Sequence, residues 1–270
     1  MNQHKIIQKL GVFVAILSLA ILSCSSISEI SSMFATETPT PTITYTPSPT
    51  FTPSPTATET QTPSPTPLPV GVKREEQPDG STLFTDYDNR YQLTLPEGWT
   101  VIPLSSKDVA AILNDLSVEN PSFKDLAETF KQLDPNVIRV IAINTDSKYV
   151  VNGFSTNLTI TAVEDKIMAA MPLDFVTGAL EESMTQQGAT VLSSGNLAKN
   201  NANGVEVGTF DFEQTSPTAA GTNVQVRSRA IIFQVNDKVI MVQLATLQQF
   251  GEELLPVLDK VSDSITLLEP

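Results

Sequence analysis

The chain has 270 residues, of which 30 are acidic and 16 are basic, giving a formal net charge of −14 at pH 7. A surface this acidic repels nucleic acid and anionic lipid headgroups, so we expect the protein itself to bind neither. Cys24 is the only cysteine, which excludes a disulfide framework and a metal site built from several cysteines. Stability must therefore come from a hydrophobic core.

The first residues have the pattern of an export signal. Lys5 and Lys9 precede an apolar run over residues 11–22, which is followed by Ser23 and Cys24. The sequence Ile-Leu-Ser-Cys at its end resembles a lipobox, where a lipoprotein precursor receives a lipid on the cysteine and is cut before it. We therefore expect a signal peptide over residues 1–23 and a lipid, such as palmitate, on Cys24.

Two other interpretations of this signal remain open, a short transmembrane anchor and an ordinary secretion signal. A spanning helix needs roughly 20 apolar residues, and this run is shorter. All three interpretations place the rest of the chain outside the cytoplasm. The lipoprotein interpretation predicts a bacterial cell-membrane protein that is anchored by its lipid and faces outward.

Residues 24–72 are rich in Thr, Pro and Ser, and the sequence Thr-Pro-Ser-Pro-Thr occurs at Thr46, Thr52 and Thr62. With few large apolar side chains, this segment cannot offset the entropy lost on ordering, so we expect a disordered stalk. Its proline content favours polyproline II at about 3.1 Å per residue, which allows a reach on the order of 100 Å. We interpret it as a spacer, with O-glycosylation or docking to a proline-binding module as additional possibilities.

Residues 73–270 have a globular composition and begin with a predicted hairpin. Strand-like runs over residues 82–85 and 91–95 are separated by Asp88 and Asn89, which tolerate the positive φ of a tight turn. Next come Pro96, Glu97, Gly98 and Trp99. The first three of these should end the second strand, and Trp99 should begin another.

The remaining elements are predicted from the spacing of apolar residues and from helix-ending signals. In chain order they are helices over 109–116 and 123–130, strands over 137–144 and 156–163, a helix over 172–188, strands over 204–212, 223–235 and 239–246, and a closing helix over 250–265. Pro256 should start the regular part of the closing helix or kink it. This order favours an α+β fold, with a predominantly antiparallel sheet sandwiched by helices, over a parallel doubly wound fold.

Three parts of the domain together resemble the PsbP-like family. They are the passage Tyr91–Trp99, which ends in Leu-Pro-Glu-Gly-Trp, the strand pair from Arg229 to Thr246, and the amphipathic closing helix. The resemblance covers roughly Ser81 to Leu268 and implies an α-β-α sandwich, which that family shares with the Ran-binding import factor Mog. The stalk and an apparent two-helix insertion over residues 106–133 depart from photosynthetic members, so photosystem binding is not implied.

The sequence contains few of the residues on which common catalytic sites depend. His4 is the only histidine and would leave with the signal peptide, so the mature chain lacks a His base, a His-containing triad and a His-based zinc site. The glycine-rich phosphate and dinucleotide motifs and the nucleophile elbow are also absent from the sequence. We therefore expect no enzyme activity, cofactor or metal.

Two groups of carboxylates could in principle support catalysis or bind a metal ion. Asp211 and Glu213 lie two apart on a predicted strand, an arrangement that suits glycoside hydrolysis when the carboxyl separation and environments fit. We expect them instead to pair with Arg227 and Arg229 on the next strand. The second group, at residues 86–89, offers oxygens for calcium but lacks the EF-hand spacing, so a hairpin turn is the better explanation.

Trp99 admits two interpretations, a ligand platform or a side chain that fixes the Pro-Glu-Gly turn against the core, and we prefer the second. The leading functional hypothesis is a lipid-anchored, non-catalytic module that binds an unknown envelope protein. A basic partner surface would complement its charge. The alternatives are a surface carrier of a small molecule or ion, recognised by a pocket with convergent polar groups, and a carboxylate-only hydrolase, recognised by two buried acids in a cleft.

Overall fold

The computed structural model describes residues 69–105, 109–119, 130, 133–151, 153–193, 198–218 and 222–269. Cys24, the predicted signal peptide and the predicted stalk up to residue 68 lie outside these residues, whereas the last residues assigned to the stalk are described and Val72 opens a strand. The predicted helix over 123–130, apart from Phe130, also lies outside the described residues. Within the described ranges, no helix has both the length and the apolar character needed to cross a membrane.

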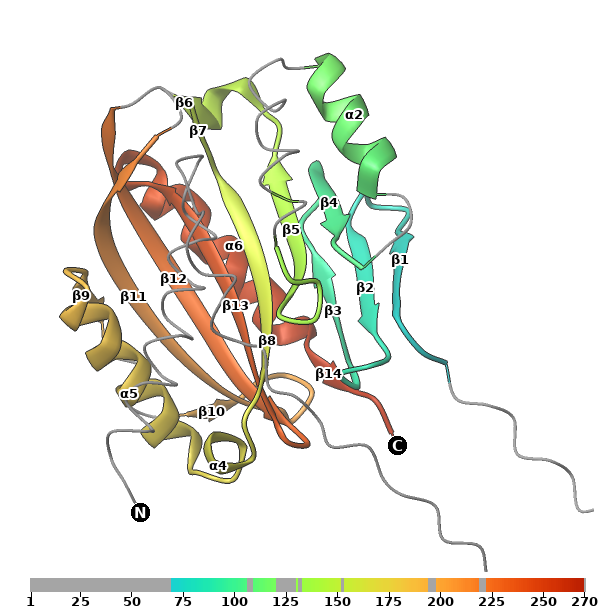
Figure 1. Ribbon diagram of the computed structural model, residues 1–270, viewed down its shortest axis with the longest axis vertical. Coiled ribbons are helices and arrows are strands. Elements are labelled where there is room, and N and C mark those ends of the chain that lie inside the picture. Colours follow the sequence, from blue (N-terminus) through green and yellow to red (C-terminus); the bar gives the residue numbers. More distant parts are fainter. Residues whose placement is uncertain are drawn as a thin grey trace, which may run out of the picture. The chain divides into compact units, whose positions relative to one another are not determined.

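The centre of the fold is an antiparallel sheet of eight strands (Figure 1). In sheet order its strands are β10 (Lys199–Asn200), β11 (Glu206–Pro217), β12 (Asn223–Val235), β13 (Lys238–Leu247), β8 (Asn157–Glu164), β5 (Ile138–Asn144) and β4 (Trp99–Pro103), with β9 (Thr190–Ser193) beside β11. Every pairing in this sheet is antiparallel.

A second, smaller sheet contains the beginning and the end of the folded chain. Its strands are β1 (Val72–Glu76), β2 (Thr82–Asp86), β3 (Tyr91–Leu95) and β14 (Thr266–Leu267). A short ribbon of β6 (Val150–Val151) and β7 (Phe154–Ser155) follows the 3₁₀ turn η2 (Ser147–Tyr149). The small sheet brings the first and last strands of the domain into one layer.

One face of the large sheet is covered by the small sheet and by helix α6 (Gly251–Ser264), which follows the 3₁₀ turn η3 (Gln248–Phe250). We call this the α6 side. Because side chains alternate along a strand, Ile231 and Phe233 of β12 join this core, whereas Ala230 and Ile232 face the other way.

The opposite face, the α5 side, carries α4 (Lys166–Ala169), α5 (Leu173–Gln186) and α2 (Val109–Glu119), and it faces the viewer in Figure 1. Helix α5 approaches β11 closely at Gly208. A Cβ atom there would lie 2.2 Å from Thr177 Oγ1, so only glycine fits at this contact.

The structure confirms the α+β fold and the predominantly antiparallel sheet covered by helices on both faces. The predicted hairpin strands, the helix at residue 109, the helix before Gly188 and the long strands of the C-terminal half are present. One local expectation was wrong, because the positive φ of the hairpin turn lies at Arg90 rather than at Asp88 or Asn89. The predicted closing helix is present as α6, with Pro256 inside it rather than at its start.

Candidate functional site

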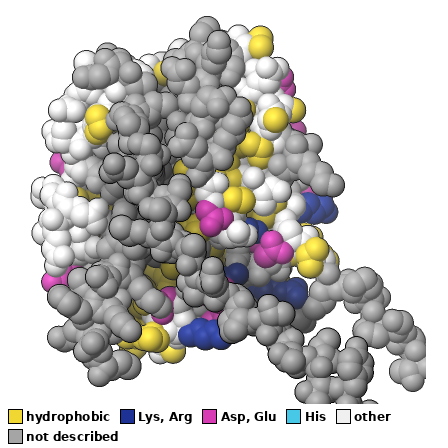
Figure 2. Space-filling view, in the orientation of Figure 1, with side chains coloured by type: hydrophobic (Ala, Val, Ile, Leu, Met, Phe, Trp, Pro, Cys, Tyr) yellow, Lys and Arg dark blue, Asp and Glu magenta, His cyan; other side chains and the backbone are white. Residues whose placement is uncertain are grey.

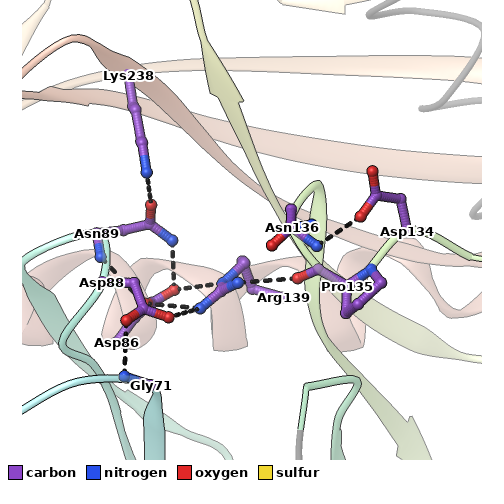
Figure 3. A network of polar contacts seen from close by, with 9 residues as sticks. All are labelled: Gly71, Asp86, Asp88, Asn89, Asp134, Pro135, Asn136, Arg139 and Lys238. Atoms are coloured by element: carbon purple, nitrogen blue, oxygen red, sulfur yellow. Dashed lines mark hydrogen bonds and ion pairs between the residues drawn. The ribbon is translucent and has the colours of Figure 1, made fainter. Parts of the chain in front are cut away.

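Charged side chains gather in two places in the described structure, and the first is the turn of the β2–β3 hairpin (Figure 3). We call Asp86, Asp88, Asn89, Arg139 and Lys238 the hairpin cluster. Arg139 lies on β5 at an irregularity in the pairing with β8, and its guanidinium reaches across to the hairpin. The cluster therefore joins the small sheet to the large one.

The Arg139 guanidinium binds both carboxylates of the turn. Its Nε is 2.7 Å from Asp86 Oδ2, and its Nη2 is 3.1 Å from Asp86 Oδ1 and 2.9 Å from Asp88 Oδ2. Asn89 Nδ2 donates to Asp86 Oδ2, and Lys238 Nζ donates to Asn89 Oδ1. The Arg139 side chain is 4% exposed and that of Asp86 is 0% exposed, so this is a buried, bidentate ion pair.

The electrostatics of the cluster follow from these contacts. Partial burial opposes ionisation of Asp88, but hydrogen bonds from the Gly71 N–H and from Arg139 outweigh it and lower the pKa of this carboxyl. Burial, and then the negative charge of Asp86, hold the pKa of the Tyr91 phenol well above its usual value. The oxygens that were considered for calcium thus lie against a guanidinium, which confirms the hairpin-turn interpretation.

The second gathering of charge lies between α6 and the large sheet, and we call it the α6 cluster. Its members are Asp211, Glu213, Arg227, Arg229, Glu252 and Asp259. Asp211 faces Arg229 and Glu213 faces Arg227 in the β11–β12 register, as the sequence predicts. Arg229 forms a bidentate pair with Asp211, at 2.7 and 3.0 Å, and a third bond to Asp259 on α6.

These contacts leave little room for carboxylate catalysis at Asp211 and Glu213. The hydrogen bond and charge of Asp211, against partial burial, raise the pKa of Arg229. Arg227 lies 4.0 Å from Glu213 and 2.5 Å from Glu252. Both acids are therefore held by arginines, and their arrangement is explained by docking of α6 on the sheet.

The Pro96–Trp99 turn is positioned as the sequence predicts. β3 ends at Leu95, Gly98 adopts a φ of +73°, and Trp99 opens β4 opposite Asn144. Trp99 is half-buried and packs against the α6-side core, so its ring supports the turn rather than standing free as a platform. Glu97 is exposed.

Helix α5 presents an exposed aromatic side chain, Phe175, on its outer surface, and we call this surface the α5 outer face. Phe175 is 60% exposed, and Gly178 and Ala179 lie one turn further along. A Cβ at Gly178 would meet no atom within 4 Å, so this side of the helix is open. Exposed Asp174 and Glu182 flank the ring along the helix.

In Figure 2, which views the α5 side, apolar side chains appear as separate spots among acidic and basic ones on the described surface. Many basic side chains are used in internal contacts, namely those of Lys73, Arg139, Lys148, Arg227, Arg229 and Lys238. The chain has more acidic than basic side chains, and Asp174 and Glu182 of α5 are among the exposed acids.

Sequence reasoning missed Arg139, although a signal was present. A lone arginine in the apolar strand Ile138–Ile143 needs a buried carboxylate partner, which the periodicity alone does not identify. Over the described ranges, no group of three or more His, Cys, Asp or Glu side chains is arranged to hold a metal ion. Cys24 falls outside the described residues, so the lipid attachment site stays a prediction.

No protein-family model matches the chain, and no curated protein sequence matches it. Among solved structures, it is similar to the cyanobacterial PsbP protein of Synechocystis, with a TM-score of 0.40 and 14% identity, covering 73% of this chain and 93% of that one. It is also similar to LpqN, which is involved in cell envelope biogenesis of Mycobacterium tuberculosis, with a TM-score of 0.36 and 10% identity over 73% and 91% of the two chains.

A third similar structure is a Pseudomonas aeruginosa protein of unknown function, a putative regulator, with a TM-score of 0.39 and 13% identity over 51% of this chain and 87% of that one. A PsbP protein is thus among the solved structures to which this chain is similar.

Proposed function

We propose that the protein is a lipid-anchored extracytoplasmic lipoprotein whose folded domain is a non-catalytic module that binds a protein of the cell envelope. The anchor would be the lipid on Cys24, and the Thr/Pro-rich stalk would act as the spacer. The observation that favours a binding role is the α5 outer face, where Phe175 stands exposed between acidic side chains.

The chemistry of this surface indicates the kind of partner. An exposed aromatic side chain flanked by small residues can enter a pocket of a partner, and buried aromatic anchors supply much of the energy in protein interfaces. Asp174 and Glu182 would then face basic residues at the rim, which increase the association rate and favour the correct partner. The partner we propose therefore has an apolar pocket with a basic border.

The binding proposal is tested by photo-crosslinking in cells with the full-length protein. A photoreactive amino acid placed at Phe175 is compared with one at Val118, which is 78% exposed on α2. We expect one envelope protein to be crosslinked repeatedly from position 175. In a separate experiment, the complex with that protein should be lost in the Phe175→Ala variant and kept in the Val118→Ala variant. Equal capture from both positions, or an unchanged complex with Phe175→Ala, would contradict the proposal.

The anchoring proposal has a separate test. Replacing Cys24 with Ala should abolish fatty-acid labelling and move the protein out of the membrane fraction, while the domain keeps its unfolding midpoint. Continued membrane association with unchanged labelling would show that the cysteine is not the lipid site. The binding proposal and the anchoring proposal can be contradicted separately, because the crosslinking test reports on α5 and the Cys24→Ala test reports on the N-terminal signal.

A further inference from the structure

A group of polar side chains lies within the α5 side of the large sheet, between the cores under α5 and α2. Thr159 and Thr161 belong to β8, and Gln243 belongs to the neighbouring strand β13. They point to the α5 side, because their sequence neighbours Leu158, Ile160 and Val242 belong to the α6-side core. We call Thr159, Thr161 and Gln243 the polar patch.

The polar patch is almost completely buried. Thr159 is 3% exposed, and Thr161 and Gln243 are each 2% exposed. The two threonine Oγ1 atoms and Gln243 Oε1 have no hydrogen-bond partner in the structure as far as it is described. Gln243 Nε2 donates to Ser228 Oγ at 3.3 Å, and with the amide in this orientation its oxygen is the free end.

The unpaired atoms lie close to one another. Gln243 is directly opposite Thr159 in the β13–β8 register, and Thr161 is opposite Met241, two positions along β13. Side chains that are directly opposite on antiparallel strands have Cβ atoms about 5 Å apart, and diagonal ones remain within reach of a shared ligand. Three hydrogen-bonding groups therefore converge on an area spanning two strands.

The surroundings of the polar patch are apolar and carry no nearby charge of the sheet. Ile141 and Ile138 of β5 lie opposite Thr159 and Thr161 and belong to the core under α2. On the other flank, Met241 belongs to the core under α5. The arginines of β12 project to the α6 side, where they bind the α6 cluster, so they cannot neutralise an anion here.

Unpaired polar groups at the centre of a sheet lower stability, because they lose their bonds to water on folding and regain none. Valine would fill the place of either threonine and suits a strand at least as well. Such groups in a native structure need an explanation, and a bound molecule that supplies the missing bonds is one that can be tested.

We propose that the polar patch binds a small uncharged molecule that carries a hydroxyl or amide group on an apolar body. The two hydroxyls can donate and accept, whereas Gln243 Oε1 only accepts, so the ligand must provide at least one O–H or N–H. The flanking isoleucines and Met241 would contact its apolar part. This site lies on the sheet rather than on the α5 outer face, so it does not depend on the proposed docking function.

The test uses methyl NMR titrations of the full-length protein, prepared without detergent, with n-octanol, octanamide and octanoate as probes of equal chain length. We expect octanol or octanamide to shift the methyl signals of Ile138, Ile141 and Met241. Octanoate should bind at least about ten-fold more weakly, because no cation among the described residues of the sheet faces the patch. Thr159→Val and Gln243→Met should each weaken binding about five-fold, the effect of one neutral hydrogen bond.

Thr246→Val is the matched control, because Thr246 is also buried but is hydrogen-bonded to Thr156. It should lower the unfolding midpoint and leave binding unchanged, whereas Thr159→Val should raise or keep the midpoint and weaken binding. Binding of none of the uncharged probes would overturn the proposal and leave buried water as the partner of these groups. Equal affinity of Thr159→Val and the parent protein, or of octanoate and octanol, would also overturn it.

Discussion

The hairpin cluster and the α6 cluster use the same chemistry in different surroundings. Each has a bidentate pair between an arginine and an aspartate, Arg139 with Asp86 in one and Arg229 with Asp211 in the other. In the first pair both side chains are less than 5% exposed, whereas Arg229 is 21% exposed and also binds Asp259, which is 60% exposed. The two arginine–aspartate pairs have the same bidentate geometry, but water reaches the pair in the α6 cluster more easily than the pair in the hairpin cluster.

This difference in water access determines how much each cluster contributes to the stability of the folded domain. Removing one partner of a buried pair leaves an uncompensated charge that water cannot reach, so the loss is large. Removing one partner of a pair near the surface allows water and the remaining carboxylates to take its place. The hairpin cluster should therefore control whether the two sheets stay together, and the α6 cluster should adjust how firmly α6 is held.

The largest effect is expected for Asp86→Ala. It leaves the buried Arg139 guanidinium with Asp88, which is 40% exposed, as its remaining carboxylate partner. The buried charge is then only partly compensated, so we expect a loss of about 3 kcal/mol in the free energy of unfolding, measured by urea denaturation. The double variant Asp86→Leu with Arg139→Met removes both charges and should recover much of this loss. A double variant as unstable as Asp86→Ala would contradict the role given to the unpaired charge.

Asp211→Ala should have a smaller effect, about 1.5–3 kcal/mol, as expected for a hydrogen bond to a charged group. Arg229 keeps its bond to Asp259 and is partly solvated, so its charge remains compensated. Measured under the same urea conditions, a loss equal to that of Asp86→Ala would show that burial does not separate the two clusters.

Lowering the pH should reduce the stability contributed by the hairpin cluster, because Asp88 becomes protonated. The folded state lowers the pKa of this carboxyl, so the unfolded chain takes up the proton first as the pH falls. The stabilisation by Asp88 is present above the unfolded pKa of about 3.9 and is lost as the pH falls through the folded pKa. Asp88→Asn should flatten the decrease in stability below about pH 4, and an unchanged slope would contradict this assignment.

The smallest effect is expected at the N-terminal end of α6, where Glu253 accepts from Lys148 Nζ at 2.7 Å and from Tyr149 at 2.8 Å. Lys148 and Glu253 are solvent-exposed and Tyr149 is half-buried. Their mutual contacts lower the pKa of Glu253 and raise that of Lys148. Glu253→Gln should leave the thermal midpoint nearly unchanged, even at low salt. A decrease as large as that of Asp211→Ala would show that exposed pairs also hold α6.

Much of the fold could be predicted because the long strands and helices have strong periodicity. β12 and β13 are long, apolar-rich segments on either side of the Asn236 turn, and the apolar positions of α5 repeat at helical spacing. The strands β1 and β14 were missed for a physical reason. β1 is an exposed, charged edge strand with no buried face, and β14 has two residues, so neither has a pattern to detect.

The site was predictable only where both partners lie on adjacent strands. The pairing of Asp211 with Arg229 followed from two neighbouring segments in one hairpin, whereas Asp86 and Arg139 are 53 residues apart and meet through the packing of two sheets. The polar patch could not be identified either, because Thr159 and Thr161 fit the composition of any half-exposed strand until the structure shows both of their faces covered.

The position of Gly71 has a mechanical consequence for a tethered protein. Its N–H donates to Asp88 Oδ1 of the hairpin cluster at 2.7 Å, and its carbonyl accepts from the Tyr87 N–H in the same turn. The residue just before β1 is therefore bonded to the β2–β3 turn through both of its backbone groups. If the protein is anchored as proposed, tension on the chain before Val70 would be passed through Asp88 to Arg139 on the large sheet. The point at which the domain would be pulled is also a place where its two sheets are joined.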